Sequence, residues 1–390
     1  MLNNKAVILS ILLSIANITG SSGLTIWIDN VLKEGGGILN TYIPLFSYLI
    51  GLSIGCMTIS FFIRNIKNIF LKENIFICSL LLATTNCLLF SKEWITISVL
   101  ADSIHRVIWG IMSGFTVILG RNILITEGNE KKTNKNFSIL SLSLLCLPFL
   151  IPIIFHLYDL NSRTSADLFA SIIYMISIII YLVGSKKKTI KKKLNVTNCI
   201  IKKNNYNIVI LSFLNLVIIN VCFFLLLMIM PAMRVIYFNY IDMTQMYIIL
   251  LTLWFPCAIF SIKIIKSANL EKKIIIGNVM QLISFGLCLI SISIGSGILY
   301  IFFMLLMFLA NMIMQPVFFS YLGLYSKNSL YTLGMQSGIY VFITTIILAY
   351  TVFINIEMEK IMIGFASLLI LSVINSITFV LIVNRGKNNK

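Results

Sequence analysis

Long apolar stretches recur along the whole 390-residue chain and are interrupted only by short polar segments. A helix that crosses ~30 Å of hydrocarbon needs roughly 20 apolar residues. Stretches of this kind lie near 6–28, 42–63, 74–91, 95–119, 137–157, 166–184, 207–230, 243–262, 274–293, 297–318, 332–354 and 361–383. They show no alternation of apolar and polar residues, so helices are the structure that satisfies their backbone hydrogen bonds in lipid. We predict an all-α membrane protein with 12 transmembrane helices.

The overall composition supports a surface that faces lipid. Hydrophobic residues make up 59% of the chain and charged residues 11%, whereas soluble domains are about half apolar and about a quarter charged. The formal net charge of +17 has nucleic-acid binding as an alternative explanation. Because the basic residues lie between the apolar stretches, contact with anionic lipid headgroups and membrane topology explain them better.

One connection is longer and more basic than the others. Residues 185–206 are rich in lysine, and they separate six apolar stretches from six more. We therefore predict an N-terminal six-helix half at 1–184, a basic cytoplasmic linker at 185–206 and a C-terminal six-helix half at 207–390. Paired halves are typical of secondary transporters, whose substrate sites lie between the halves.

The distribution of basic residues predicts the orientation. With the N-terminus inside, most of the 30 Lys and Arg residues fall in segments on the cytoplasmic side, as the positive-inside rule requires. We expect both termini in the cytoplasm, in a multi-pass protein of the bacterial inner membrane.

The chemistry-bearing residues argue against an enzyme or a metalloprotein. The eight cysteines have no CxxC spacing, and His105 and His156 are far apart in the sequence. No nucleophile with a matching base and no phosphate-binding loop can be recognised. We predict no cofactor and no metal, and a membrane-embedded enzyme is the least supported alternative.

Charged residues inside an apolar stretch are functional candidates, because a charge at the bilayer centre is costly. Arg106 falls near mid-bilayer in the stretch 95–119, and Asp102 precedes it by four residues, on the same helix face. We predict that Arg106 faces a polar cavity and that the two residues take part in proton coupling. A static pair that only allows Arg106 to be inserted is the alternative. His105 is interpreted as a packing or interfacial residue in preference to a proton carrier.

The second half offers amides in place of charges within its apolar stretches. Hydrogen bonds between helices explain most of these amides, while some are candidate substrate contacts. The amides are Asn215, Asn220, Gln281, Asn311, Gln315 and Gln336. We select Asn215 and Asn220, together with Trp109 of the first half, as possible substrate contacts.

Prolines and small residues mark places where helices bend or approach closely. Pro148 and Pro152 lie in one apolar stretch, where each removes a backbone hydrogen bond and favours a bend. Gly110 and Gly114 form a small-xxx-small pair, which permits close helix contact, as do Gly51 and Gly55. We predict gating or bending roles for Gly110, Gly114, Pro148 and Pro152.

Three sequence motifs resemble a known family. Residues 106–114 read Arg-Val-Ile-Trp-Gly-Ile-Met-Ser-Gly, similar to the fourth-span signature of major facilitator superfamily antiporters. Residues 120–123 and 147–153 read Gly-Arg-Asn-Ile and Leu-Pro-Phe-Leu-Ile-Pro-Ile, similar to motifs of the Bcr/CflA group of drug exporters. The resemblance covers about residues 50–155. It implies the major facilitator fold, alternating access, proton-driven efflux, a monomer, and a coupling role for Arg106 with a gating role for Arg121.

Other positions depart from the pattern of that group. The acidic residue of its loop between spans two and three is replaced by Arg64, and Trp109 occupies its glutamine position. Its first-span aspartate falls near Ser21, so we infer that Asp102 replaces this proton carrier. These departures predict a specialised exporter.

We therefore predict a proton-coupled secondary transporter that exports a small organic molecule, such as a drug, an antibiotic or a natural product. The expected partners are that substrate, protons and membrane lipids, and nucleic acid is not expected. An importer or uniporter of a small metabolite and a degenerate, non-transporting membrane protein are the alternatives.

Overall fold

The computed structural model describes most of the chain. The described residues are 2–21, 27–28, 31, 38–66, 69–91, 99–125, 130–158, 163–185, 206–237, 241–267, 270–326, 328–354 and 358–388. The predicted linker, 185–206, lies almost entirely outside them, so the proposed domain boundaries stay a prediction. The side chain of Arg64 also lies outside the described part.

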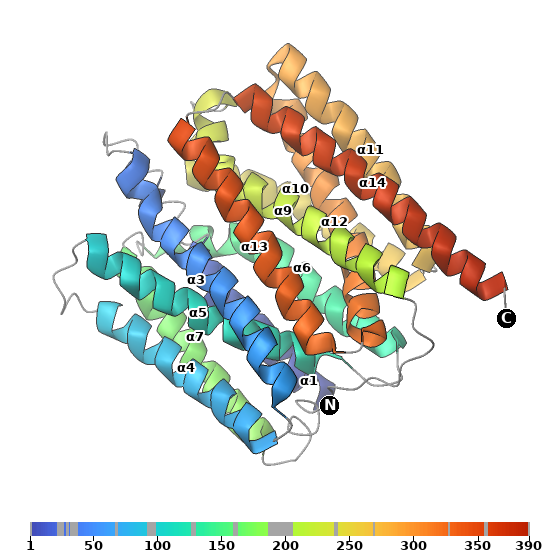
Figure 1. The fold of residues 1–390 in the computed structure, drawn as a ribbon. Helices are drawn as coiled ribbons and strands as arrows, with labels where there is room; N and C mark the ends of the chain where they lie inside the picture. The colour runs from blue at the N-terminus through green and yellow to red at the C-terminus, as the bar shows by residue number, and fades with distance from the viewer. Residues whose placement is uncertain are drawn as a thin grey trace.

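Twelve helices with assigned bounds account for the twelve apolar stretches, which confirms the predicted fold class (Figure 1). They are α1 (Leu2–Ser21), α3 (Ile38–Asn65), α4 (Ile69–Ser91), α5 (Val99–Ile123), α6 (Glu130–Leu157), α7 (Arg163–Ser185), α9 (Tyr206–Tyr237), α10 (Met243–Ser267), α11 (Leu270–Ile294), α12 (Gly297–Tyr325), α13 (Ser329–Ile354) and α14 (Met358–Asn388). Most extend a few residues beyond the predicted spans, because helix continues into the polar flanks.

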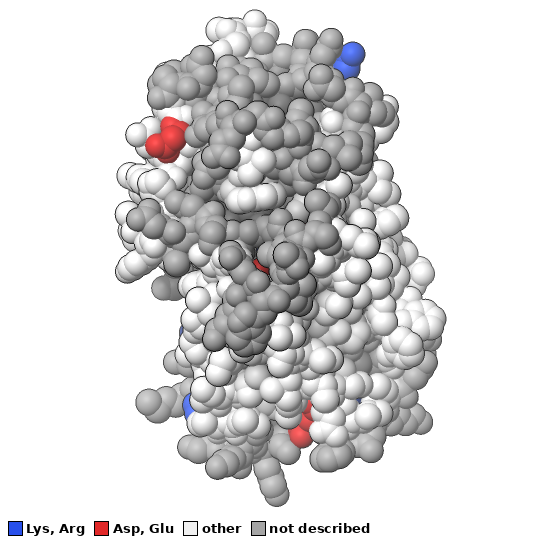
Figure 2. Space-filling view, turned by 90° about the vertical axis from the view of Figure 1, so that its left-hand side faces the viewer, with Lys and Arg blue, Asp and Glu red and all other residues white. Residues whose placement is uncertain are grey.

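The surface between the helix ends is apolar. Within the described residues, ten helices are long and apolar enough to cross a membrane, while α1 and α10 have shorter apolar stretches. Phe62, Ile179 and Ile374 each expose more than half of their side-chain area, and charged residues are sparse on the face in Figure 2. Such a large apolar surface marks contact with lipid, so the chain is a multi-pass membrane protein.

Helices α3 and α5 pack with their backbones in contact through four glycines. A Cβ at Gly51 would overlap the Val107 carbonyl oxygen of α5, and a Cβ at Gly114 would lie 2.6 Å from the Cys56 backbone nitrogen of α3. Only glycine fits at such a distance. The small-xxx-small pairs of the sequence therefore form one close seam between these two helices.

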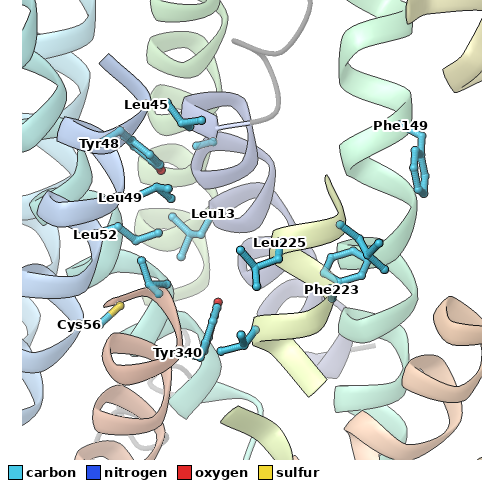
Figure 3. Packing of buried hydrophobic residues seen from close by; sticks show 14 of the residues in the cluster. Leu13, Leu45, Tyr48, Leu49, Leu52, Cys56, Phe149, Phe223, Leu225 and Tyr340 are labelled. Atoms are coloured by element: carbon cyan, nitrogen blue, oxygen red, sulfur yellow. The ribbon is translucent and has the colours of Figure 1, made fainter. Parts of the chain in front are cut away.

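The two halves meet along α3 and α13 on one side, and along α6 with α10 and α12 on the other. The Ser53 hydroxyl donates to the Gly338 carbonyl oxygen across the first contact, at 2.9 Å. The ring centroids of Phe149 and Phe308 lie 5.4 Å apart across the second. Figure 3 shows the shared core, where Tyr340 and Leu225 of the C-terminal half lie near Leu13 and Leu52.

Candidate functional site

A buried cluster of ionisable side chains joins α5 to α7. Arg106 is fully buried, and its Nε atom lies 3.5 Å from Asp102 Oδ1, one turn away on α5. Its Nη1 atom lies closer, 3.0 Å, to Oδ1 of Asp167 on α7. One guanidinium therefore serves two carboxylates, and the nearer of them comes from another helix.

His105 completes this cluster. Its Nε2 atom lies 3.2 Å from the same Asp167 oxygen that contacts Arg106. Phe90 of α4 stacks on the imidazole with ring centroids 4.0 Å apart. The imidazole thus packs against an aromatic ring, and its nitrogen also contacts a carboxylate. We name Asp102, His105, Arg106 and Asp167 the proton cluster, after the role that is proposed for them below.

A chain of hydroxyl groups extends from this cluster toward the centre of the molecule. The Arg106 guanidinium carbon lies 5.0 Å from the Trp109 ring centroid, and the Trp109 indole donates to the Tyr174 hydroxyl at 3.2 Å. That hydroxyl lies 2.6 Å from the Ser113 Oγ atom. The Tyr48 hydroxyl lies 3.3 Å from the same Oγ and 2.7 Å from Asn17 Oδ1.

Asn17 lines a cavity between the two halves. The cavity contains about 480 Å³ of empty space, including its open mouth. Its lining combines amides and hydroxyls with aromatic and aliphatic side chains. The lining residues are Asn17, Ile18, Ser21, Arg121, Leu144, Pro148, Asn220, Phe223, Phe224, Gln315 and Tyr340.

Two polar contacts order the cavity wall. The Gln315 Nε2 atom of α12 donates to Asn220 Oδ1 of α9 at 2.7 Å. The Arg121 Nη1 atom of α5 donates to the Ser337 hydroxyl of α13 at 2.6 Å, which links the two halves. The Arg121 guanidinium carbon also lies 5.4 Å from the Phe319 ring centroid.

The candidate site residues selected from the sequence lie at different places in the structure. Arg121, Pro148 and Asn220 line the cavity, whereas Arg106 and Asp102 lie in the proton cluster, inside the N-terminal half and outside the cavity lining. Trp109 and Asn215 are also fully buried away from that lining. Gly110 and Gly114 belong to the α3–α5 seam, and Pro152 is buried within α6.

Sequence reasoning missed Asp167 and Asn17. Asp167 lies one residue inside the predicted span 166–184 and received no assignment. Its position between Ala166 and Ala170, both fully buried, is the signal for an inward-facing carboxylate. Asn17 lies in the middle of the first apolar stretch and received no assignment.

Comparison with known proteins gives matches in structure alone. No family model matches the chain, and no curated protein sequence matches it. The fold is similar to a proton:xylose symporter, XylE, solved with 6-bromo-6-deoxy-D-glucose, at a TM-score of 0.70 and 11% identity over 97% of this chain and 95% of that one.

Two further solved structures align over nearly their whole length. The human organic anion transporter MFSD10 has a TM-score of 0.71 at 12% identity, covering 96% of this chain and 99% of that one. A bacterial homologue of the iron transporter ferroportin, outward-facing and soaked with iron, has a TM-score of 0.70 at 12% identity, covering 97% and 99%. The chain therefore shares the major facilitator fold of these proteins, and the residues that the structure describes form twelve helices in two six-helix halves.

Proposed function

We propose that this protein is a proton-coupled secondary transporter that exports a small organic molecule across the bacterial inner membrane by alternating access. The observation that carries the proposal is the proton cluster, where one buried guanidinium is shared by two carboxylates and an imidazole is within reach. Burying charges in this way is costly, and ionisable groups inside a membrane protein mark ion pathways.

The geometry gives protonation a structural effect. Charged Asp167 holds both Arg106 and His105 through one oxygen atom. A proton on Asp167 weakens both contacts and leaves Arg106 to pair with Asp102. Arrival and departure of a proton thus shift the guanidinium between α7 and α5. Cys87 of α4 interacts electrostatically with Asp167 and Arg106, and the hydroxyl of Tyr174 interacts with Cys87.

The cluster and the cavity are physically connected. Trp109, Tyr174, Ser113 and Tyr48 link Arg106 to Asn17 through one ring contact and successive hydrogen bonds. A shift of Arg106 therefore changes the environment of a cavity-lining side chain. This connection is what proton-coupled transport needs, since the substrate and the proton bind at different places.

Contacts between the halves supply the gate. Arg121 bonds to Ser337, and the Ser329 hydroxyl lies 3.2 Å from Asn122 Oδ1. The centroids of Phe137 and Phe319 lie 5.4 Å apart. All of these lie toward the helix ends that the basic residues assign to the cytoplasm. Alternating access requires these contacts to break and re-form in each cycle.

Export is supported by the sequence resemblance to drug exporters. The test uses purified monomeric protein in liposomes that contain a trapped pH-sensitive dye. The probes are a panel of amphipathic compounds that are anionic, neutral or cationic. We expect at least one compound to move protons through wild-type protein and to accumulate against its gradient, with Asp102→Asn and Asp167→Asn impairing both.

Vesicles of the two orientations distinguish export from import. Compound flux that is unchanged when the pH gradient is collapsed would rule out proton coupling and favour a uniporter. Absence of flux for the whole panel, with cells unaffected by Arg106→Ala, would favour a non-transporting membrane protein.

A further inference from the structure

Arg121 is a buried cation on the wall of the cavity. Its side chain is 4% exposed, and it lines the cavity near the C-terminal end of α5. Unlike Arg106, it has no carboxylate partner among the residues that the structure describes. Its Nη1 atom donates to the neutral Ser337 hydroxyl, and its side chain also lies within hydrogen-bond reach of the neutral Tyr340 hydroxyl. Its Nε atom has no hydrogen-bond partner there.

Its surroundings offset the positive charge only in part. The C-terminal end of a helix contributes about half of a negative elementary charge, and the Phe319 ring adds a weak cation–π attraction. The positive charge of a buried cation with such partners is only partly neutralised, so an anion beside it would be stabilised. In the proton cluster, by contrast, Arg106 has two carboxylates.

The rest of the cavity wall is suited to an apolar body with few polar atoms. Phe223, Phe224 and Tyr340 supply aromatic surface, and Ile18 and Leu144 supply aliphatic surface. Among the residues that the structure describes, the lining contains no acidic side chain, so an organic cation has no carboxylate to pair with in this part of the wall. Gln315 keeps a carbonyl oxygen without a partner among described residues, which is available to a donor group of a ligand.

We propose that Arg121 is the recognition residue for an organic acid, whose carboxylate pairs with the guanidinium while its apolar body packs on Phe223 and Phe224. This inference rests on the proposed transport function and names the substrate class for that cavity. Binding of the acid replaces Ser337 as the partner of Arg121. Occupancy of the cavity therefore weakens a contact that holds the two halves together.

The test is a binding assay on purified full-length protein in detergent, which needs neither transport nor a proton gradient. The probes are matched triplets of aromatic and aliphatic compounds with 8 to about 20 carbon atoms, each as a carboxylate, its amide and the corresponding amine. Thermal stabilisation selects the tightest member, and titration gives its dissociation constant. We expect carboxylates to bind tightest.

Four variants test the role of Arg121. Arg121→Met should weaken carboxylate binding roughly tenfold to a hundredfold, as expected for a hydrogen-bonded charge, and Arg121→Lys should retain part of it. Ser337→Asp gives the guanidinium a permanent carboxylate partner and should weaken binding to a similar extent, while Ser337→Ala should leave it unchanged or tighter. Lys5→Met, which removes a cation outside the cavity lining, is the matched control.

Two results of the binding assay would overturn the proposal. No preference for carboxylates over their amides and amines overturns the proposal, and so does equal binding by wild-type and Ser337→Asp protein. If Arg121→Met fails to fold, the Ser337→Asp and Ser337→Ala variants still test whether carboxylates bind to Arg121. Carboxylate binding without proton-coupled flux would leave this inference intact and remove the proposed function instead.

Discussion

The two six-helix halves bury different kinds of polar side chain. Among described side chains, the N-terminal half buries Asp102, His105, Arg106, Arg121 and Asp167 within its helices, and it buries Lys72 and Glu73 near the start of α4. The C-terminal half buries amides there, and its buried ionic side chain in the described part, Lys273, lies near the start of α11. Under the proposed function, this difference is a division of labour, in which the N-terminal half responds to protons and the C-terminal half supplies neutral hydrogen bonds.

The largest expected effect is in the proton cluster. Arg106→Met leaves Asp102 and Asp167 without their shared cation, so we expect roughly 3–5 kcal/mol of destabilisation and loss of transport. Thermal unfolding in detergent and flux in liposomes measure the two effects. Adding Asp102→Asn and Asp167→Asn to this variant should recover much of the stability, because the unpaired charges are then gone.

The matched change in the C-terminal half is Gln281→Met, which removes a buried amide of α11. It should cost less, about 1 kcal/mol. Equal destabilisation by Gln281→Met and Arg106→Met would contradict the energetic asymmetry of the halves.

The next effect concerns packing. A Cβ at Gly110 would lie 2.6 Å from the Leu52 backbone nitrogen, which cannot move away as a side chain can. We therefore expect Gly110→Ala to destabilise the protein by roughly 1–3 kcal/mol, measured by thermal unfolding. In the C-terminal half, a Cβ at Gly286 of α11 meets nothing within 4 Å.

Gly286→Ala is consequently the control, and it should be neutral or stabilising by up to about 1 kcal/mol. Equal losses at Gly110 and Gly286 would show that the close seam is not a special feature of the N-terminal half.

A smaller effect, on coupling, is expected for Asp167→Asn. The amide has nearly the same shape but cannot exchange a proton, so gradient-driven accumulation should fall about tenfold, while exchange without a gradient persists. Infrared difference spectra between acid and alkaline pH should lose a carboxyl band. Asp242→Asn changes an exposed carboxylate that accepts from the Gln245 backbone nitrogen at 2.7 Å, and it should preserve coupling.

The smallest effect is expected in the C-terminal half. Gln315→Met removes the donor to Asn220, and affinity for the tightest probe should fall by a factor of roughly 2 to 12. The number of protons moved per substrate should not change. If Gln315→Met changed the number of protons moved per substrate and left the affinity for the probe unchanged, it would contradict the proposed division of roles between the two halves.

Much of the fold follows from the sequence, because bilayer thickness sets the length of an apolar helix. Each helix of the structure overlaps one predicted span. The Asp102–Arg106 pair follows from helix periodicity, which brings residues four apart to one face. The tight α3–α5 seam follows from the spacing of Gly51, Gly55, Gly110 and Gly114, although their mutual contact depends on which helices are neighbours.

The candidate sites depend on tertiary packing and could be predicted only in part. The position of Arg106 within its apolar stretch predicted that it lies near the middle of the bilayer. It did not predict the direction of the side chain, which points to Asp167, 61 residues further along the chain on another helix. Arg121 was selected as a gating residue through its motif, whereas its place on the cavity wall depends on α13 and α12. No short-range pattern encodes these neighbours.

Helix α3 has different surroundings on its two glycine-lined sides. Toward α5, the atoms nearest to an added Cβ belong to backbone. Toward α13, the nearest atoms belong to side chains, Met57 for Gly338 and Ser60 for Gly334, and backbone carbonyl oxygens come next, at 3.1 Å and 2.9 Å. Contacts between backbones fix one geometry, and flexible side-chain tips can separate and re-form. We therefore expect helices α3 and α5 to move together, so that a change in the tilt of α5 alters the distance from α3 to α13 directly. Mechanical coupling between the halves then needs no loop to transmit it.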